Sequence, residues 1–64
     1  MWFICVFPKK DSNGRSYACR EEVLADSKEQ SKENIKEDNP EVDEFEINVR
    51  EASEEEVHRI ESEF

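Results

Sequence analysis

Residues 2–7 are Trp2-Phe3-Ile4-Cys5-Val6-Phe7, and this apolar run decides the fold. Aromatic and β-branched residues favour a β-strand. Successive side chains of a strand point to opposite faces, and here both faces are apolar. Such a strand belongs in the middle of a sheet that is covered on both sides. Pro8 follows at once and is expected to end the strand.

The next segment predicts a hairpin. Residues 11–14 form a turn cluster with Asn13-Gly14 at its centre, and Asn-Gly is the strongest short hairpin signal. Residues 15–24 are expected to return as a second strand. Glu21 interrupts one of its apolar faces, which indicates a strand that lies at a sheet edge or ends in a bulge.

A polar helix is predicted from Ser27 to about Asp38. Ser27 is the expected N-cap, and Gln30 three residues later completes a capping box. Ile35 is the only large apolar residue of this helix. The helix is therefore expected either to hold the sheet weakly or to face mainly solvent.

Residues 42–50 alternate in polarity, which predicts a third strand. Phe45, Ile47 and Val49 are expected to face the core, while Glu44 and Glu46 face solvent.

A last helix is expected to begin after Ser53, which forms a second capping box with Glu56. Val57, Ile60 and Phe64 then make an apolar stripe that is expected to cover one face of the sheet.

These elements predict one small acidic α+β domain over residues 1–64. Their order is strand, strand, helix, strand, helix (ββαβα). A crossover through the first helix would place the third strand beside the first. The expected architecture is a three-stranded antiparallel-type sheet in the order 2-1-3, with two helices.

The charges of the chain are unevenly distributed. Residues 1–20 carry four cations and one anion, whereas residues 21–64 carry five cations and 17 anions. The net charge of −9 exceeds what solubility requires, and it destabilises the compact state by self-repulsion. A basic partner is the simplest reason for keeping this excess.

The carboxylates of the second half allow two interpretations. They are either solvated helix ends and an outer strand face, or a surface that imitates the phosphates of a nucleic acid. On the expected strand, Glu44 and Glu46 would lie ~7 Å apart, close to the phosphate spacing along a nucleic-acid strand. The partner-binding residues expected on the second interpretation are Glu37, Asp38, Glu41, Asp43, Glu44, Glu46, Glu54, Glu55 and Trp2.

Trp2 itself also has two interpretations. The two expected helices offer few apolar residues to cover both faces of the first strand. Trp2 therefore belongs either to the core or to an exposed interface.

The sequence predicts no catalytic, metal or cofactor site. Cys5, Cys19 and His58 are its only soft metal ligands, and they include no Cys-x-x-Cys pair. The two thiols are expected to be reduced, and a disulfide is the alternative if the hairpin loop places them opposite each other. His58 lies among glutamates and is expected to face solvent, because catalysis would need a nucleophile or a second base held in a cleft.

The apolar run at residues 2–7 is too short for the core of a signal peptide or for a membrane span. A soluble, cytoplasmic protein is therefore expected.

In the order and spacing of its elements, the stretch Trp2–Val49 resembles the small bacteriophage proteins that inhibit bacterial RNA polymerase. The matching pieces are Trp2-Phe3-Ile4-Cys5-Val6, Leu24-Ala25-Asp26-Ser27 and Phe45-Glu46-Ile47-Asn48-Val49. The last helix and the nearly all-polar first helix depart from that layout. The resemblance implies a short viral protein that disables a host nucleic-acid machine, and it transfers no functional residue.

Charge and resemblance together predict a non-enzymatic viral inhibitor that binds a basic surface of a host nucleic-acid enzyme or defence complex. The alternative is a small structural or regulatory oligomer whose acidic shell keeps it soluble. The expected partner is a host protein that itself binds nucleic acid. Direct binding to nucleic acid or to a membrane is not expected, and a homodimer is left open.

Overall fold

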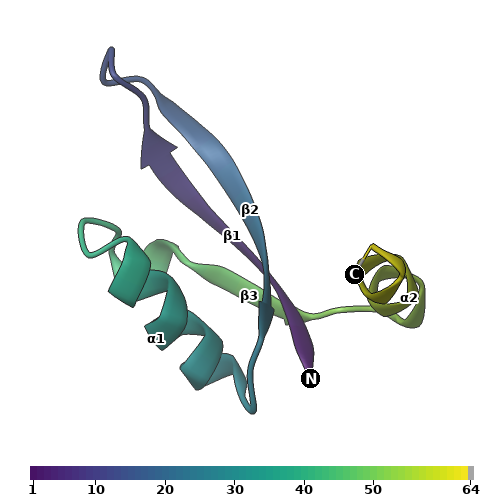
Figure 1. Ribbon diagram of the computed structural model, residues 1–64. Coiled ribbons are helices and arrows are strands. Elements are labelled where there is room, and N and C mark those ends of the chain that lie inside the picture. The colour runs from purple at the N-terminus through teal and green to yellow at the C-terminus, as the bar shows by residue number, and fades with distance from the viewer. Residues whose placement is uncertain (64) are drawn as a thin grey trace.

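A three-stranded antiparallel sheet with two helices makes up the fold, seen in a computed structural model that describes residues 1–63 (Figure 1). The elements are β1 (Trp2–Lys10), β2 (Ser16–Leu24), α1 (Lys28–Asp38), the short 3₁₀ helix η1 (Glu44–Glu46), β3 (Asn48–Glu51) and α2 (Glu54–Ser62). The strand order is β2-β1-β3. The predicted α+β class, the ββαβα order and the central place of the first strand are confirmed.

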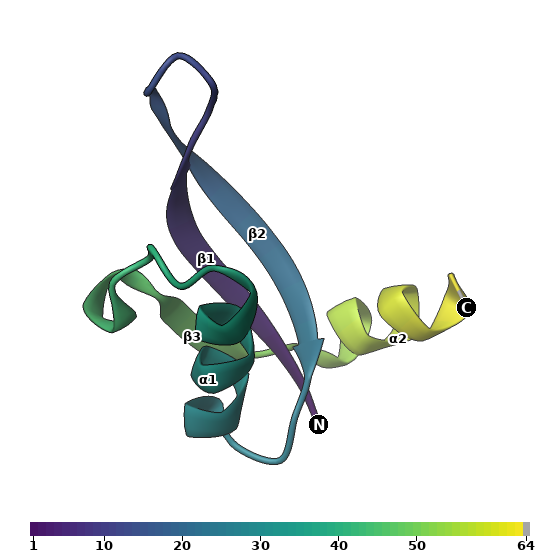
Figure 2. The same cartoon turned by 60° about the vertical axis from the view of Figure 1, so that its left-hand side comes forward.

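The β1–β2 hairpin projects beyond the rest of the molecule (Figures 1 and 2). Its turn is held by Asp11, whose Oδ1 accepts hydrogen bonds from the backbone N–H groups of Asn13 and Arg15, both at 2.9 Å. Gly14 has a φ of 79°, a conformation that glycine adopts without strain. We call residues 8–18 the hairpin arm. The arm contributes to the elongated shape of the molecule, which measures 35 × 22 × 16 Å.

Pro8 lies inside β1, so the expectation that it ends the strand is wrong. Odd-numbered residues of β1 direct their backbone polar groups towards β2, and Met1 O accepts from Ala25 N–H at 3.0 Å. Even-numbered residues direct them to the opposite side, where Trp2 O accepts from Ala52 N–H at 2.9 Å. The backbone nitrogen of Pro8, which carries no hydrogen, therefore faces β3. The pairing of β1 with β2 is undisturbed.

The same proline explains why the third strand is shorter than residues 42–50. The β1–β3 ladder ends at the pair Val6↔Asn48. The next hydrogen-bonded pair would join Pro8 to Glu46, and Pro8 has no N–H to donate. The chain before Asn48 therefore leaves the sheet and forms η1. Phe45, which was expected to face the core, is 93% exposed as a result.

The main core lies between α1 and the face of the sheet that carries Phe3, Cys5 and Phe7. Its other buried members are Ala25, Ile35, Val42 and Ile47. The expectation of an inward-facing residue is confirmed for Ile47, and Val49 is half-buried against the same cluster.

Helix α1 meets this face with only two buried residues, Ser31 and Ile35. Ser31 is small and its Oγ donates to Lys28 O at 2.7 Å, so its hydroxyl is satisfied inside the helix. A polar helix can therefore pack closely on the sheet. Its N-cap is Ser27 as predicted, with Ser27 Oγ accepting from Gln30 N–H at 3.1 Å. The Gln30 side chain accepts from Asp26 N–H rather than from the N-cap itself.

Helix α2 belongs to the other face of the sheet. Ile4 on that face and Ile60 on α2 are both buried, and neither belongs to the main cluster. The predicted capping box between Ser53 and Glu56 is present with both of its arms. Of the predicted stripe, Val57 is half-buried, and Phe64 lies outside the described residues.

Candidate functional site

Six exposed carboxylates lie together between the last turn of α1 and the start of β3. We call them the acidic surface: Glu37, Asp38, Glu41, Asp43, Glu44 and Glu46. The sequence predicted all six as partner-binding residues, and the fold brings them onto one loop and its two ends. The expected strand spacing of Glu44 and Glu46 is wrong, because both lie in η1 rather than in a strand.

Buried anchors hold this loop in place. Asn39 ends α1 and donates to Ile35 O twice, from its backbone N–H at 2.8 Å and from Nδ2 at 3.0 Å. Val42 and Ile47 are buried on either side of η1. Lys36 Nζ also donates to Val42 O at 2.9 Å. The carboxylates are therefore displayed from a fixed backbone, which lowers the entropy lost on binding a partner.

Within residues 1–63, no member of the acidic surface forms an ion pair, although Lys9, Lys10, Lys32 and Lys36 line hollows beside it. Among residues 1–63, the ion pairs are Arg20–Glu22, Arg20–Glu56 and Arg50–Glu56, and none of them includes a member of the acidic surface. A cluster of unpaired carboxylates produces a negative field that attracts cations over about 8–10 Å at ordinary ionic strength.

The helix dipoles distinguish two groups of predicted residues. Glu54 and Glu55 lie in the first turn of α2, where the dipole stabilises anions. Glu37 and Asp38 lie at the end of α1, where the same dipole destabilises them by about 0.3–1 kcal/mol each. A gain in helix stability therefore explains why Glu54 and Glu55 stand where they do. It does not explain the positions of Glu37 and Asp38.

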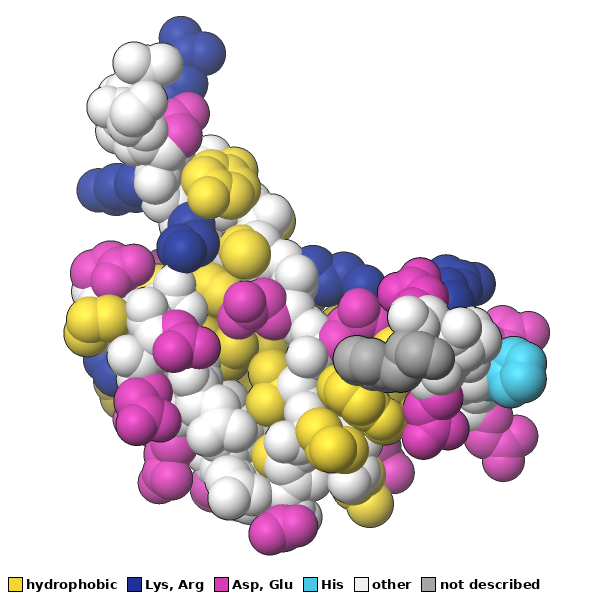
Figure 3. Space-filling model, in the orientation of Figure 1, with side chains coloured by type: hydrophobic (Ala, Val, Ile, Leu, Met, Phe, Trp, Pro, Cys, Tyr) yellow, Lys and Arg dark blue, Asp and Glu magenta, His cyan; other side chains and the backbone are white. Residues whose placement is uncertain are grey.

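The remaining predicted residues lie apart from the acidic surface. Glu54 and Glu55 are on α2, which the two views place away from α1 (Figures 1 and 2). Trp2 is half-buried near the start of β1. Figure 3 shows the wider charge pattern: Lys and Arg side chains gather on the hairpin arm, and carboxylates predominate over the body of the molecule and α2, where further Lys and Arg side chains also lie.

Glu56 holds α2 to the sheet. Its carboxylate accepts two hydrogen bonds from Arg50, at 2.6 and 2.7 Å, and one from Arg20 at 3.4 Å. Arg50 lies on β3 and Arg20 on β2, so one carboxylate joins both edge strands. The hydrogen bonds from Arg50, and then that from the Ser53 backbone, hold the pKa of Glu56 well below its usual range.

Replacing Glu56 with Gln is expected to lower the melting temperature at neutral pH. A carboxyl group with a lowered native pKa adds stability above its unfolded pKa of about 4.3, and loses it as pH falls through the native value. The difference between wild type and Glu56→Gln should therefore be largest near neutral pH and shrink in acid. Thermal melts followed by circular dichroism at about pH 7, 4 and 2.5 measure this.

Glu55→Gln is the matched control, because Glu55 is exposed on the same helix turn and makes no ion pair. If the difference in melting temperature between wild type and Glu56→Gln is the same at the lowest pH as at neutral pH, the lowered pKa of Glu56 is contradicted.

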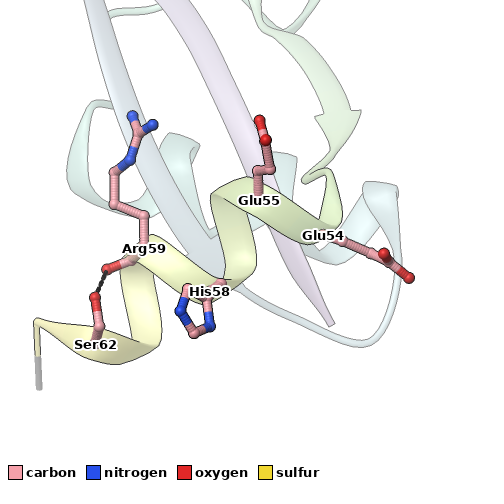
Figure 4. Close-up of a pocket in the computed structure, with 5 residues that line it drawn as sticks. All are labelled: Glu54, Glu55, His58, Arg59 and Ser62. Carbon is pink, nitrogen blue, oxygen red and sulfur yellow. Dashed lines mark hydrogen bonds between the residues drawn. The ribbon is translucent and has the colours of Figure 1, made fainter.

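A hollow of about 540 Å³ lies along α2 and is lined by Glu54, Glu55, His58, Arg59 and Ser62 (Figure 4). All five residues come from one helix, and their side chains fan out from it rather than converge. Ser62 Oγ donates to Arg59 O at 2.9 Å, which satisfies that hydroxyl locally. His58 is exposed, as predicted. This surface does not bring a nucleophile within hydrogen-bond reach of a base, the arrangement that marks nucleophilic catalysis.

The two cysteines are free thiols. Cys5 pairs with Glu21 across the hairpin and Cys19 pairs with Phe7, so the cysteines are diagonal rather than opposite. Burial raises the pKa of the Cys5 thiol, which keeps it neutral and unreactive. In the part of the chain that the structure describes, no cluster of three or more His, Cys, Asp or Glu side chains could hold a metal ion.

Sequence reasoning missed one residue of this region. Phe45 lies between Glu44 and Glu46, and its exposure makes it a prominent apolar feature of the loop. Pro8 was visible in the sequence, but only the pairing register of β1 with β3 places it opposite Glu46, where it has no N–H to donate.

Comparisons with protein-family models, with curated protein sequences and with solved structures found no match to this chain. Over residues 1–63, no helix has both the length and the apolar character needed to cross a bilayer.

Proposed function

We propose that this chain is a non-enzymatic binding protein whose acidic surface occupies the basic, nucleic-acid-binding surface of another protein. One observation carries the proposal: six exposed carboxylates, none of them in an ion pair, are displayed from the last turn of α1 and the anchored loop that follows it. Two of them, Glu37 and Asp38, lie where the α1 dipole makes them unfavourable. A surface that is kept despite a cost to stability is better explained by binding than by solubility.

The chemistry of the partner follows from the surface. Proteins that bind nucleic acids carry grooves of Lys and Arg that neutralise phosphates. A rigid array of carboxylates can compete for such a groove and exclude the nucleic acid. In line with the layout that resembles bacteriophage inhibitors, the proposal is that the partner belongs to a bacterial host, in whose cytoplasm the protein would inhibit a nucleic-acid enzyme or defence complex.

The partner is expected to be captured in a salt-dependent manner that requires the acidic surface. Wild-type protein on a resin is exposed to bacterial lysate, and captured proteins are identified by mass spectrometry. The variant Glu37→Gln/Asp38→Asn/Glu41→Gln should lose at least about 90% of the captured partner. Raising salt from about 50 to about 500 mM should release it from wild type, because surface charges are then screened.

The control variant Glu33→Gln/Glu61→Gln/Glu63→Gln removes three exposed carboxylates outside the acidic surface and should capture the partner normally. Added DNA should compete for the captured protein, while the chain alone should give no gel shift with DNA. A partner that is held equally by both variants, or at both salt concentrations, would overturn the proposal.

A further inference from the structure

Phe45 is displayed as a rigid apolar anchor. Its side chain is 93% exposed, yet its backbone is well held. Asp43 Oδ1 accepts from Phe45 N–H at 3.2 Å, and Asp43 O accepts from Glu46 N–H at 2.9 Å. The flanking residues Val42 and Ile47 are buried. An exposed aromatic residue on an anchored turn binds at low entropic cost, and aromatic residues are enriched among interface hot spots.

A hollow that suits this anchor lies at the base of the hairpin arm. It measures about 380 Å³, and its lining includes Val6, Pro8, Tyr17 and Ala18, with Glu46 at its border. The hollow is open to solvent, so an aromatic side chain can lie against its apolar residues. Tyr17 is itself 49% exposed there and offers an aromatic surface.

Basic residues border the same place. A second hollow adjoins the first and shares Pro8, Ser16 and Glu46 with it; its lining also holds Lys9 and Lys10, together with Glu41, Val42 and Asp43. Neither lysine forms an ion pair within residues 1–63, and neither does Glu46. The chain thus carries an aromatic anchor flanked by carboxylates, and an apolar hollow beside two lysines that form no ion pair although carboxylates of the same copy lie near them.

We infer that two copies of this chain form a dimer in which Phe45 of each copy enters the hollow at the base of the other copy's hairpin arm. Glu46 beside the anchor then meets Lys10 beside the hollow. Glu46 borders the hollow and directly follows Phe45, so anchor and hollow are neighbours on one surface. A two-fold axis that passes between the anchor and the hollow brings the anchor of each copy to the hollow of the other, which gives a closed dimer.

The dimer covers two of the four exposed large apolar residues of the described chain, Phe45 and Tyr17; the others are Met1 and Leu24. The net charge of −9 on each copy opposes association, but that repulsion is screened beyond about 8 Å at physiological salt. The same screening weakens the attraction within a Glu–Lys pair in direct contact much less. A contact of this small size gives a weak dimer, so association is measured at up to about 500 µM protein, where a Kd in the upper micromolar range is detected.

Sedimentation equilibrium of the full chain tests the inference directly. Wild type should show a monomer–dimer equilibrium, and Phe45→Ala should raise the dimer Kd at least about tenfold. Leu24→Ala is the matched control, because Leu24 is 61% exposed at the far end of β2 from the arm, and it should leave the Kd unchanged. Both substituted side chains are exposed, so both variants should fold.

A mixing experiment tests the reciprocal charge contact. Glu46→Lys and Lys10→Glu should each be monomeric alone, because each places like charges together in its own dimer. Mixed in equal amounts, they should form a heterodimer in which both contacts are restored.

Wild type that is monomeric at about 500 µM overturns the inference, as does a dimer that Phe45→Ala leaves intact or a mixture that stays monomeric. These variants avoid Glu37, Asp38 and Glu41, so failure here is distinguishable from failure of the proposed function.

Discussion

Phe7→Ala is expected to lower the free energy of unfolding by about 3–5 kcal/mol. Phe7 is 2% exposed and lies in the main core between the sheet and α1. Truncation removes the transfer free energy of a buried ring and leaves a cavity that Val42 and Ile47 can fill only in part. A core of this size rarely supplies more than about 3–5 kcal/mol, so the variant should be largely unfolded at room temperature. Urea titration followed by circular dichroism measures the loss.

Phe45→Ala is the matched control for this result. The chemical change is the same, but Phe45 is exposed, so its unfolding free energy should change by less than about 0.5 kcal/mol. The measurement is made at low protein concentration, where self-association does not contribute. Equal losses for the two variants would mean that residues 44–46 pair with β1 as a strand and that the exposed turn is wrong.

Ile60→Ala is expected to cost about 2–4 kcal/mol, the second largest effect. Ile60 is 4% exposed, and it lies one helical turn after Glu56, so the two side chains share a face of α2. Glu56 reaches Arg20 and Arg50, which pair with Val6 and Ile4 across the sheet. That pairing places the first turn of α2 at the face of the sheet opposite the main core, and Ile60 is buried one helical turn further on.

His58→Ala is the control in the same helix, since His58 is exposed and alanine favours helix at least as well. It should melt within about a degree of wild type. If Ile60→Ala also melts within about a degree of wild type, helix α2 is peripheral, and Ile4 must be covered by another copy or a partner.

The sequence by itself determined the parts of the fold that depend on local chemistry. The doubly apolar run of β1 placed it at the centre of the sheet, and the turn residues around Gly14 placed the hairpin. Ser27 and Ser53 marked both helix starts, because a hydroxyl that accepts a backbone N–H two or three residues later is a local device. The six carboxylates of the acidic surface are exposed, and their role as partner-binding residues stays a prediction.

Tertiary structure decided what depends on pairing between distant residues. Alternation predicted Phe45 as a core residue, but the pairing register put Pro8 opposite that segment and turned Phe45 outward. Likewise, nothing local to Glu56 indicated that it would join two arginines from opposite edges of the sheet. Periodicity records which residues can share a face, whereas the partner across the sheet decides whether a backbone hydrogen bond can form there. The pattern of residues 42–50 favours a strand throughout. Because Pro8 of β1 has no N–H to donate, the chain forms an exposed aromatic turn there instead.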